Sequence, residues 1–263
     1  MWPLGSERSG LLKTSGCKAT ILTPTENTSE AGKAEAMPKE NSAPNLFKLM
    51  FQAHPWHGVS PGKQAPEAVN AFIEIVPTDA VKYELDKESG HLHVDRPQRF
   101  SSICPSLYGF IPQTFCGEHV ADLTAERTGK SGIQGDGDPM DICVLTEKTF
   151  AQGNFFLRAT PIGGLRMIDG EQADDKIIAV LEADLAYGHI KDISECPKAL
   201  VDRLKHYFLS YKQFPGEAPR RVEIADVYDR AEALDVITRS LSDYQKKFGD
   251  PAARTKELKR VTS

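Results

Sequence analysis

Short runs of apolar and β-branched residues dominate the chain from about residue 71 to residue 182. The runs are AFIEIV, VKYEL, HLHVD, DICVL, FFLRATPI and KIIAVLE, and turn-forming stretches such as KESG separate them. Runs of this length and composition are typical of β-strands. The pattern therefore predicts a small, mostly antiparallel sheet or barrel.

The period changes to a helical one towards the C-terminal end. In PKALVDRLKHYFLSYKQFPG, apolar residues recur at positions 200, 204, 207, 208 and 211, with proline near the start and Pro-Gly after the end. A second helix is predicted over roughly residues 229–248, where a glycine closes it. The fold class predicted is mainly β (α+β), with two C-terminal helices packed outside the strands.

The polar segment between Phe115 and Gly135, CGEHVADLTAERTGKSGIQ, has neither a clear strand nor a clear helix pattern. We predict that it is a long loop. Loops of this length in compact domains are often functional.

The two ends of the chain differ in composition from its centre. Residues 1–45 are rich in Ser, Thr, Lys, Glu, Ala and Pro, which predicts a disordered N-terminal tail. The first 25 residues hold three basic residues and one acid, but neither an Arg-rich amphipathic pattern nor an apolar signal core. Organelle targeting is thus the lesser alternative to a cytoplasmic location. We predict one domain over residues 46–250 and a flexible tail over residues 251–263.

Charge and cysteine content exclude several classes of protein. The net charge of −5 comes without a basic stripe, which disfavours nucleic-acid binding. No apolar run approaches the roughly 20 residues that a membrane helix needs. The five cysteines are odd in number and contain no C-x-x-C pair, so neither a disulfide framework nor a zinc ribbon is indicated. A reducing compartment such as the cytoplasm fits this pattern best.

The segment GDGDPMDICV places Asp136, Asp138 and Asp141 within six residues. Each negative charge raises the cost of ionising the next, and hard cations such as Mg²⁺ prefer oxygen ligands. An EF-hand loop beginning at Asp136 is excluded, because Met140 stands at a ligand position and Asp141 where glycine is needed. The sequence leaves two interpretations open: a metal site and a solvated acidic turn.

A second acidic group lies in MIDGEQADDKIIAV, between two predicted strands. Alone it is typical of a hairpin loop. Two carboxylate clusters from separate segments are what a site with two or more metals requires. Together they suggest a multi-metal site. The acids of this group are Asp169, Glu171, Asp174 and Asp175.

Basic and hydroxyl side chains accompany the carboxylates. Strand alternation in KYE points Lys82 and Glu84 to one face and Tyr83 to the other. Arg and Lys next to metals suit a phosphate substrate. Each of these residues taken alone is more often a surface charge or, for a tyrosine, part of the core. The histidine pairs of HPWH and HLH lack a third ligand, so zinc is disfavoured. The further candidates are Glu74, Arg96, Tyr108, Tyr211 and Lys212.

With these motifs the chain resembles the soluble family I inorganic pyrophosphatases. Their signature D-x-D-P-x-D-x here reads DGDPMDI, and it is joined in the same order by FIEIVPTDAVKYELDKESGHLHVDR, PSLYGFIPQTF, MIDGEQADDKIIAV and HIKDI…HYFLSYK. The resemblance spans roughly residues 70–215. It implies a five-stranded closed β-barrel of the OB kind and Mg²⁺-dependent hydrolysis of pyrophosphate, with several Mg²⁺ per active site. It also implies a homo-oligomer, either a hexamer or a dimer.

The resemblance also implies a role for each matching residue. Asp138 is implied as the base that deprotonates the attacking water. The implied ligands of the first metal pair are Asp136, Asp141 and Asp174, with Asp169 joining Asp174 at a further metal. The implied substrate-binding residues are Lys82, Arg96, Lys176, Tyr211 and Lys212. The implied supporting residues are Glu74, Glu84 and Tyr108.

One departure from the family pattern keeps alternatives open. The family commonly has Asp-Glu where this chain has Asp169-Gly170, so the second acidic role either moves to Glu171 or is lost. We leave Glu171 outside the predicted site. The alternatives are an inactive metal-binding homologue and a phosphohydrolase of nucleotides or longer polyphosphates, although no P-loop is present. An OB-type nucleic-acid binder is disfavoured by the acidic balance.

Overall fold

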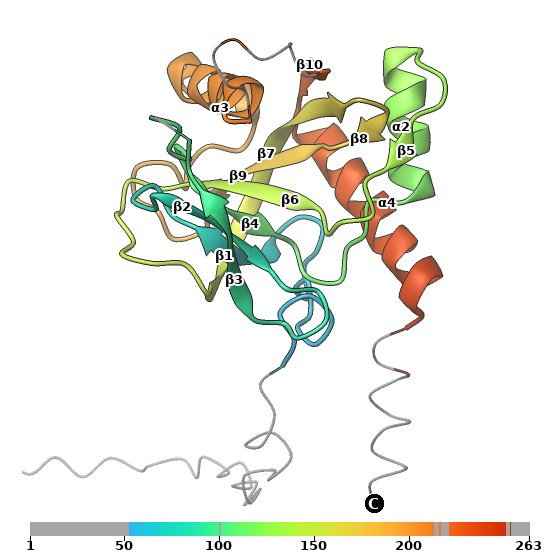
Figure 1. Cartoon of the computed structure of the whole chain (residues 1–263), viewed down its shortest axis with the longest axis horizontal. Coiled ribbons are helices and arrows are strands. Elements are labelled where there is room, and N and C mark those ends of the chain that lie inside the picture. The colour runs from blue at the N-terminus through green and yellow to red at the C-terminus, as the bar shows by residue number, and fades with distance from the viewer. Residues whose placement is uncertain (1–52, 100, 213–215, 217–220, 251–252, 254–263) are drawn as a thin grey trace, which may run out of the picture. The chain divides into compact units, whose positions relative to one another are not determined.

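The computed structural model describes residues 53–99, 101–212, 216, 221–250 and 253 (Figure 1). These residues belong to the compact unit Leu46–Ser263. Apart from residue 253, the predicted tails over 1–45 and 251–263 lie outside the described residues, and the predicted domain bounds stay a prediction. None of the helices in the described ranges has the length and apolarity needed to cross a membrane.

Five strands form a closed ring at the centre of the domain. The order around the ring is β1, β4, β6, β9 and β7, and β7 pairs with β1 to close it. Within this ring β6 and β9 pair in parallel and the other neighbours are antiparallel, and a closed ring has no free strand edge. The predicted mainly β fold with a five-stranded, OB-like closed barrel is confirmed. The ring strands are β1 (Val69–Ile75), β4 (Leu107–Phe110), β6 (Asp141–Leu145), β7 (Phe155–Asp169) and β9 (Lys176–Leu181).

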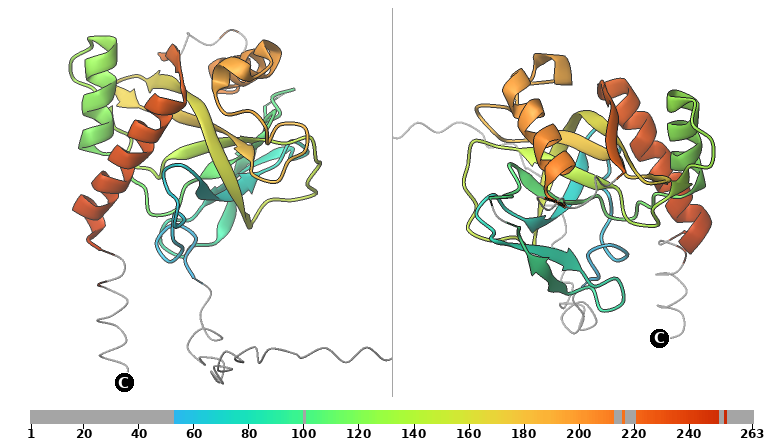
Figure 2. Two further views of the ribbon diagram at one scale, coloured as in Figure 1. Left: turned by 180° about the vertical axis from the view of Figure 1, so that it is seen from behind. Right: turned by 45° about the horizontal axis from the view of Figure 1, so that its top comes forward.

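The remaining elements surround this ring (Figures 1 and 2). β2 and β3 form a separate two-stranded hairpin, and β10 pairs with the second half of β7. These elements are β2 (Val81–Leu85), β3 (Leu92–Pro97), β5 (Gln134–Gly135), β8 (Gln172–Ala173), β10 (Val222–Tyr228), α2 (Glu118–Thr128), the short 3₁₀ helix η1 (Ile193–Glu195), α3 (Lys198–Ser210) and α4 (Arg230–Phe248).

The first ring strand is buried on both of its faces. Val69, Ala71 and Ile73 point into one apolar cluster, while Phe72 packs with Trp56 in another. Successive side chains of a strand point to opposite faces, so each face of β1 meets its own group of apolar partners. This explains why the run AFIEIV has no alternation of polar and apolar residues.

The strand predicted over residues 155–162 is much longer in the structure. β7 continues to Asp169, and its second half pairs with β9 and β10. The segment PIGG reads as a turn signal, but Gly163 and Gly164 here allow close packing: a Cβ at Gly164 would lie 2.3 Å from the Tyr228 ring. Pairing on both edges thus overrides the local turn preference.

The long loop predicted between Phe115 and Gly135 is wrong in its central part, which forms α2. Val120, Ala121 and Leu123 bury one side of this helix. No side chain of its own caps the N-terminus; instead the Asp243 carboxylate on α4 accepts hydrogen bonds from the backbone N–H of Gly117, at 3.1 Å, and of His119 and Val120. This cap comes from a residue more than a hundred positions away, so local pattern could not reveal it.

Both predicted C-terminal helices are confirmed. α4 begins after Asp229, whose carboxylate accepts a hydrogen bond from the Glu232 N–H at 2.9 Å. α4 lies against β7 and beside α2, as the two views of Figure 2 also show. α3 buries Val201, Leu204 and neighbouring aromatic residues against the other side of the barrel. Its C-terminal end carries two of the predicted site residues.

We expect Gly109→Ala to destabilise the domain strongly. A Cβ at this position in β4 would lie 1.8 Å from the Phe72 carbonyl oxygen of β1, so backbone would have to move. Overpacking of this kind costs typically about 1–3 kcal/mol or more. Urea denaturation of the variant beside the unsubstituted chain measures the loss in the free energy of unfolding. Equal stability of Gly109→Ala and the unsubstituted chain would contradict the packing described.

Candidate active site

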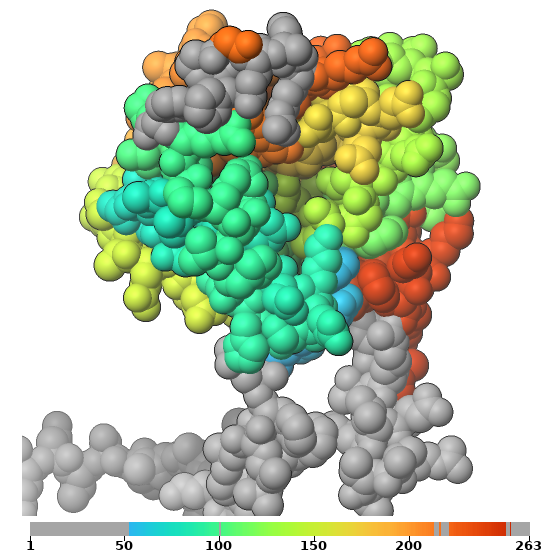
Figure 3. All heavy atoms as spheres, in the orientation of Figure 1, coloured from blue at the N-terminus to red at the C-terminus, as the bar shows by residue number. Residues whose placement is uncertain are grey.

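A cavity of about 460 Å³ lies where the β2–β3 hairpin faces the starts of β6 and β9. All predicted site residues except Asp136 and Asp169 line it. Figure 3 shows this part of the domain, with the blue-green residues of the hairpin next to yellow-green and yellow residues from later in the chain. The cavity wall therefore combines carboxylates and cations from five separate strands and from the end of α3.

A buried lysine stands at the acidic end of the cavity. Asp141 and Lys176 are direct neighbours in the parallel β6–β9 pair, which brings the Lys176 Nζ to 2.5 Å from the Asp141 Oδ2. The same ammonium contacts the Asp174 carboxylate, and only 2% of the Lys176 side chain is exposed. The Tyr108 hydroxyl donates to the Asp141 Oδ2 at 2.6 Å. These contacts unite residues that are up to 68 positions apart.

The turn that carries the other two signature aspartates is held against Cys116. The backbone N–H groups of Cys116 and Gly137 donate to the carbonyls of Asp138 and Cys116, at 2.8 and 3.1 Å. Gly137 has a φ of 79°, a conformation that favours glycine. The Asp138 N–H donates to the Asp136 Oδ1 at 2.9 Å, so the Asp136 carboxylate folds back over its own turn. The signature segment therefore forms a tight bend at Gly137.

Burial and mutual repulsion disfavour ionisation of the inward carboxylates. Burial and the nearby Asp174 charge raise the pKa of Asp136, and burial raises the pKa of Asp141. Burial, with the charge of Asp141, also raises the pKa of Glu74 to about 8, and the Glu74 Oε1 accepts the Leu85 N–H at 2.7 Å. Ionisation of the whole cluster is therefore costly in the metal-free protein.

The β2–β3 hairpin supplies cations to the cavity, each paired with a carboxylate. The Lys82 Nζ lies 2.7 Å from the Glu84 Oε2, as the predicted alternation of β2 requires. Asp95 connects this pair to the neighbouring strand: its Oδ2 accepts from Lys82 at 2.9 Å and from the Arg96 Nη1 at 2.5 Å. Asp95 was not among the predicted residues, although it directly precedes Arg96 in the motif HVDR.

The end of α3 brings in the last predicted residues. Tyr211, buried to 9% exposure, stacks on Tyr207 with ring centroids 4.8 Å apart. The Lys212 Nζ donates to the Asp169 Oδ2 at 2.8 Å, which brings Asp169 next to the cavity at the end of β7. Gly170 follows in a turn with a φ of 69°, and the exposed Glu171 does not line the cavity. Leaving Glu171 outside the site agrees with this geometry.

Three further cavity residues with hydrogen-bonding side chains were missed by the sequence interpretation. Lys87, in the turn between β2 and β3, contacts the Asp138 Oδ1. The Arg99 Nη1 donates to the Lys212 carbonyl at 3.3 Å. Trp56 reaches the cavity from before the first strand, and its Nε1 donates to the Thr114 carbonyl at 2.8 Å. Lys87 lies in the KESG turn, so it could have been predicted as a charged residue of the hairpin that carries Lys82 and Glu84. The sequence around Arg99 and Trp56 holds no pattern that indicates a site.

The acidic residues fit a hard divalent cation by the chemistry of their donors. Within the described ranges, no three His, Cys, Asp or Glu side chains already form a metal cage. The Lys176 ammonium lies between Asp141 and Asp174 instead. However, the donors are all carboxylate oxygens, and burial together with the nearby Asp174 charge raises the pKa of Asp136. A cation would relieve that repulsion.

Comparison with known proteins gives matches that agree with each other. The family model described as inorganic pyrophosphatase matches residues 71–245. The inorganic pyrophosphatase of Chlamydia trachomatis serovar D is 52% identical over 196 residues, which cover 73% of this chain and 94% of that protein. The soluble inorganic pyrophosphatase 2 of Chlamydomonas reinhardtii is 37% identical over 196 residues, covering 74% and 91% of the two chains.

A solved structure agrees with this assignment. The crystal structure of inorganic pyrophosphatase from Thermus thermophilus superposes with a TM-score of 0.61 at 28% identity, and the match covers 73% of this chain and 99% of that one. The matched family region includes every predicted site residue. The chain therefore belongs to the inorganic pyrophosphatase family, as its motifs predicted.

Proposed function

We propose that this protein hydrolyses inorganic pyrophosphate to two phosphates in a reaction that depends on Mg²⁺. One observation carries the proposal: the crowded carboxylates around Lys176 and the cations of the β2–β3 hairpin and of the end of α3 line a single cavity of about 460 Å³. Carboxylates suit metal ions, and nearby Lys and Arg suit phosphoryl oxygens. A small, highly charged phosphate anhydride is a substrate that would engage both the metal-holding carboxylates and the Lys and Arg side chains.

The carboxylates are proposed as the metal-holding residues. Asp136, Asp141 and Asp174 would hold the first cations, and Asp169 with Asp174 would hold a further one. Divalent cations bound there supply positive charge that lowers the pKa of a water molecule and offsets the charge of phosphoryl oxygens. Family membership and the carboxylate-only donor set support Mg²⁺ as the preferred ion.

Asp138 is proposed as the general base. Its side chain is 42% exposed at the cavity and is not held by Lys176, so one carboxylate oxygen can accept the proton of an incoming water. As that proton moves to Asp138, the water oxygen bonds to one phosphorus and the bond from this phosphorus to the bridging oxygen breaks. The second phosphate leaves with the bridging oxygen. No covalent intermediate with the protein is required.

The basic residues are proposed to bind the phosphoryl oxygens. Lys82 and Arg96 approach from the hairpin, Lys212 and Tyr211 from the end of α3, and Lys176 from β9. Their positive charge and hydrogen bonds stabilise the charge of the leaving phosphate. Glu74, Glu84 and Tyr108 are proposed to orient water and the neighbouring carboxylates; the contact of Tyr108 with Asp141 supports this for Tyr108.

Phosphate release from pyrophosphate tests the proposal. We expect rapid release by the full chain with Mg²⁺, loss of release after EDTA, and little release from ATP in the same assay. Release from ATP at a similar rate would favour the alternative, a broader phosphohydrolase. Metal binding without release from either compound would favour the inactive homologue and direct attention to Gly170 and Glu171.

Location and assembly are further parts of the proposal. We propose a cytoplasmic homo-oligomer, a hexamer or a dimer. The cysteines at positions 104, 116, 143 and 196 are all buried and unpaired, which supports a reducing compartment. Light scattering of the purified chain gives the solution mass, and a monomer at all concentrations would exclude an oligomer.

Stability of the metal-free protein should fall as the pH rises from about 4.5 to about 8. Folding raises the pKa of Glu74 from its ordinary value of 4.5 to about 8. In this interval the folded state binds more protons than the unfolded state, so the free energy of unfolding decreases with pH. Excess Mg²⁺ should remove the decrease because cations favour the ionised carboxylates. Thermal unfolding followed by circular dichroism in EDTA and in Mg²⁺ measures both effects; a melting temperature in EDTA that rises over this interval would contradict the prediction.

A further inference from the structure

The start of β9 presents side chains to two different environments. Asp174 and Lys176 line the active-site cavity, whereas Asp175 between them does not. Alternation along an extended chain directs Asp175 to the opposite side. There its side chain is completely buried. Whatever holds Asp175 therefore sets the direction in which Asp174 and Lys176 point.

Arg166 of β7 is the cation that holds Asp175. The Arg166 Nη2 lies 3.5 Å from the Asp175 Oδ2, and only 1% of the Arg166 side chain is exposed. Its guanidinium carbon lies 4.9 Å from the centroid of the Tyr228 ring on β10. A cation over an aromatic face is favourable, and the ring covers Arg166 from the side of β10. Arg166 is thus fixed inside the domain.

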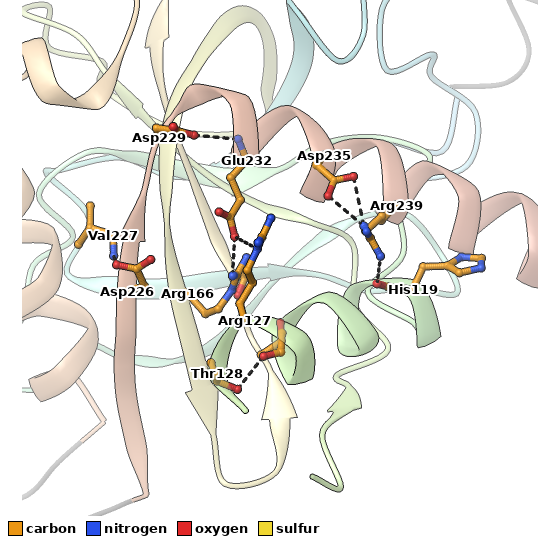
Figure 4. Close-up of polar contacts among 12 residues, drawn as sticks. His119, Arg127, Thr128, Arg166, Asp226, Val227, Asp229, Glu232, Asp235 and Arg239 are labelled. Carbon is orange, nitrogen blue, oxygen red and sulfur yellow. Dashed lines mark hydrogen bonds and ion pairs between the residues drawn. The ribbon is translucent and has the colours of Figure 1, made fainter. Parts of the chain in front are cut away.

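The same guanidinium is anchored to the two outer helices. Its Nη1 donates to the Glu232 Oε1 of α4 at 2.6 Å, and the Arg127 Nε of α2 donates to the same oxygen at 3.2 Å. Figure 4 shows the contacts of the Glu232 carboxylate with both Arg166 and Arg127. A row of alternating charges therefore leads from the helices to the residue between Asp174 and Lys176.

Fold stability alone is a poor explanation for this arrangement. Two buried charges lose their hydration, and replacement of a buried ion pair by uncharged residues is often neutral or stabilising. Within the described residues, the Arg166 Nε has no hydrogen-bond partner, and the Arg166–Asp175 contact is long at 3.5 Å. Incomplete pairing makes the net gain smaller still. A role in orienting the neighbouring site residues explains why Arg166 and Asp175 are buried as a charged pair.

We propose that Arg166 and Asp175 are positioning residues, which direct Asp174 and Lys176 into the active site. The inference rests on the metal and substrate roles proposed above for those two residues. Neither Arg166 nor Asp175 touches the cavity. Partners one contact removed from metal ligands typically change metal affinity by about 10- to 100-fold when substituted.

A double variant, Arg166→Met with Asp175→Asn, tests the proposal. It removes both charges together and preserves side-chain size, so no buried charge is left uncompensated. We expect a melting temperature near that of the wild type, an Mg²⁺ dissociation constant raised about 10- to 100-fold by calorimetry without substrate, and a lower kcat. Arg127→Met, which removes only the half-exposed outer member, should leave the dissociation constant, kcat and KM unchanged.

A folded double variant with wild-type Mg²⁺ affinity, kcat and KM would overturn the proposal. If the double variant does not fold, Arg166→Lys decides the matter: it keeps the charge but not the planar, forked geometry, so weaker Mg²⁺ binding is expected and unchanged binding would overturn the proposal. The wild type serves as the separate test of the proposed function. If the wild type itself binds no Mg²⁺ and releases no phosphate, the proposed function fails, independently of Arg166.

Discussion

Asp138→Asn is expected to lower kcat for pyrophosphate hydrolysis by about 10²- to 10⁴-fold, the usual contribution of a positioned general base. The carboxamide has the same shape as the carboxylate but does not take the proton of the attacking water. Because Asp138 makes no contact with Lys176 and contacts Lys87 at the cavity rim, the fold and the inner carboxylates should be preserved. Steady-state phosphate release with saturating Mg²⁺ measures the loss.

Two controls distinguish loss of the base from loss of the site. Asp122→Asn makes the same chemical change on the exposed side of α2 and should leave kcat unchanged. Mg²⁺ binding by Asp138→Asn should remain close to that of the wild type. Full activity of Asp138→Asn would disprove the base assignment, and lost Mg²⁺ binding would instead identify Asp138 as a metal ligand.

Lys176→Met is expected to destabilise the metal-free protein by about 3–5 kcal/mol, the usual result of removing one partner of a buried charge group. The Lys176 ammonium is the cation in contact with both Asp141 and Asp174, and its side chain is 2% exposed. Without it two inner carboxylates face each other uncompensated. Urea denaturation in EDTA measures the free energy of unfolding.

Mg²⁺ should restore much of this loss, because divalent cations supply the positive charge that the lysine provided. Activity should remain low even so, since Lys176 is also proposed to bind substrate. Lys198→Met is the matched control: Lys198 also pairs with an aspartate, Asp202, but its side chain is 86% exposed, so no measurable change in stability is expected. Equal losses for the two variants in EDTA would contradict the role of Lys176.

Several features of the candidate site could be predicted from the sequence, because they depend on residues that are close together along the chain. Strand alternation fixes that Lys82 and Glu84 share a face, and the ion pair between them follows from that rule alone. The signature turn likewise depends on its own Gly137 and on short-range hydrogen bonds. Chemistry that is encoded within a few residues can be predicted before the fold is known.

Other site features arise only from contacts between distant segments. Lys87, Arg99 and Trp56 reach the cavity because a hairpin, a loop and the segment before β1 fold around it. No periodicity in their own neighbourhoods predicts this. The position of Glu171, which follows the family departure at Gly170, could also be read only from the fold. There Glu171 is exposed and does not line the cavity.

The sequence by itself determined the class of fold, the two C-terminal helices, the carboxylate signature and the family resemblance, because periodicity and motif spacing are local properties. The tertiary structure decided that α2 forms, through its cap from Asp243, and that β7 continues past its glycines, through pairing on both edges. It also placed Arg166 behind Asp175. These features depend on partners far away along the chain, and only the packed domain brings such partners together.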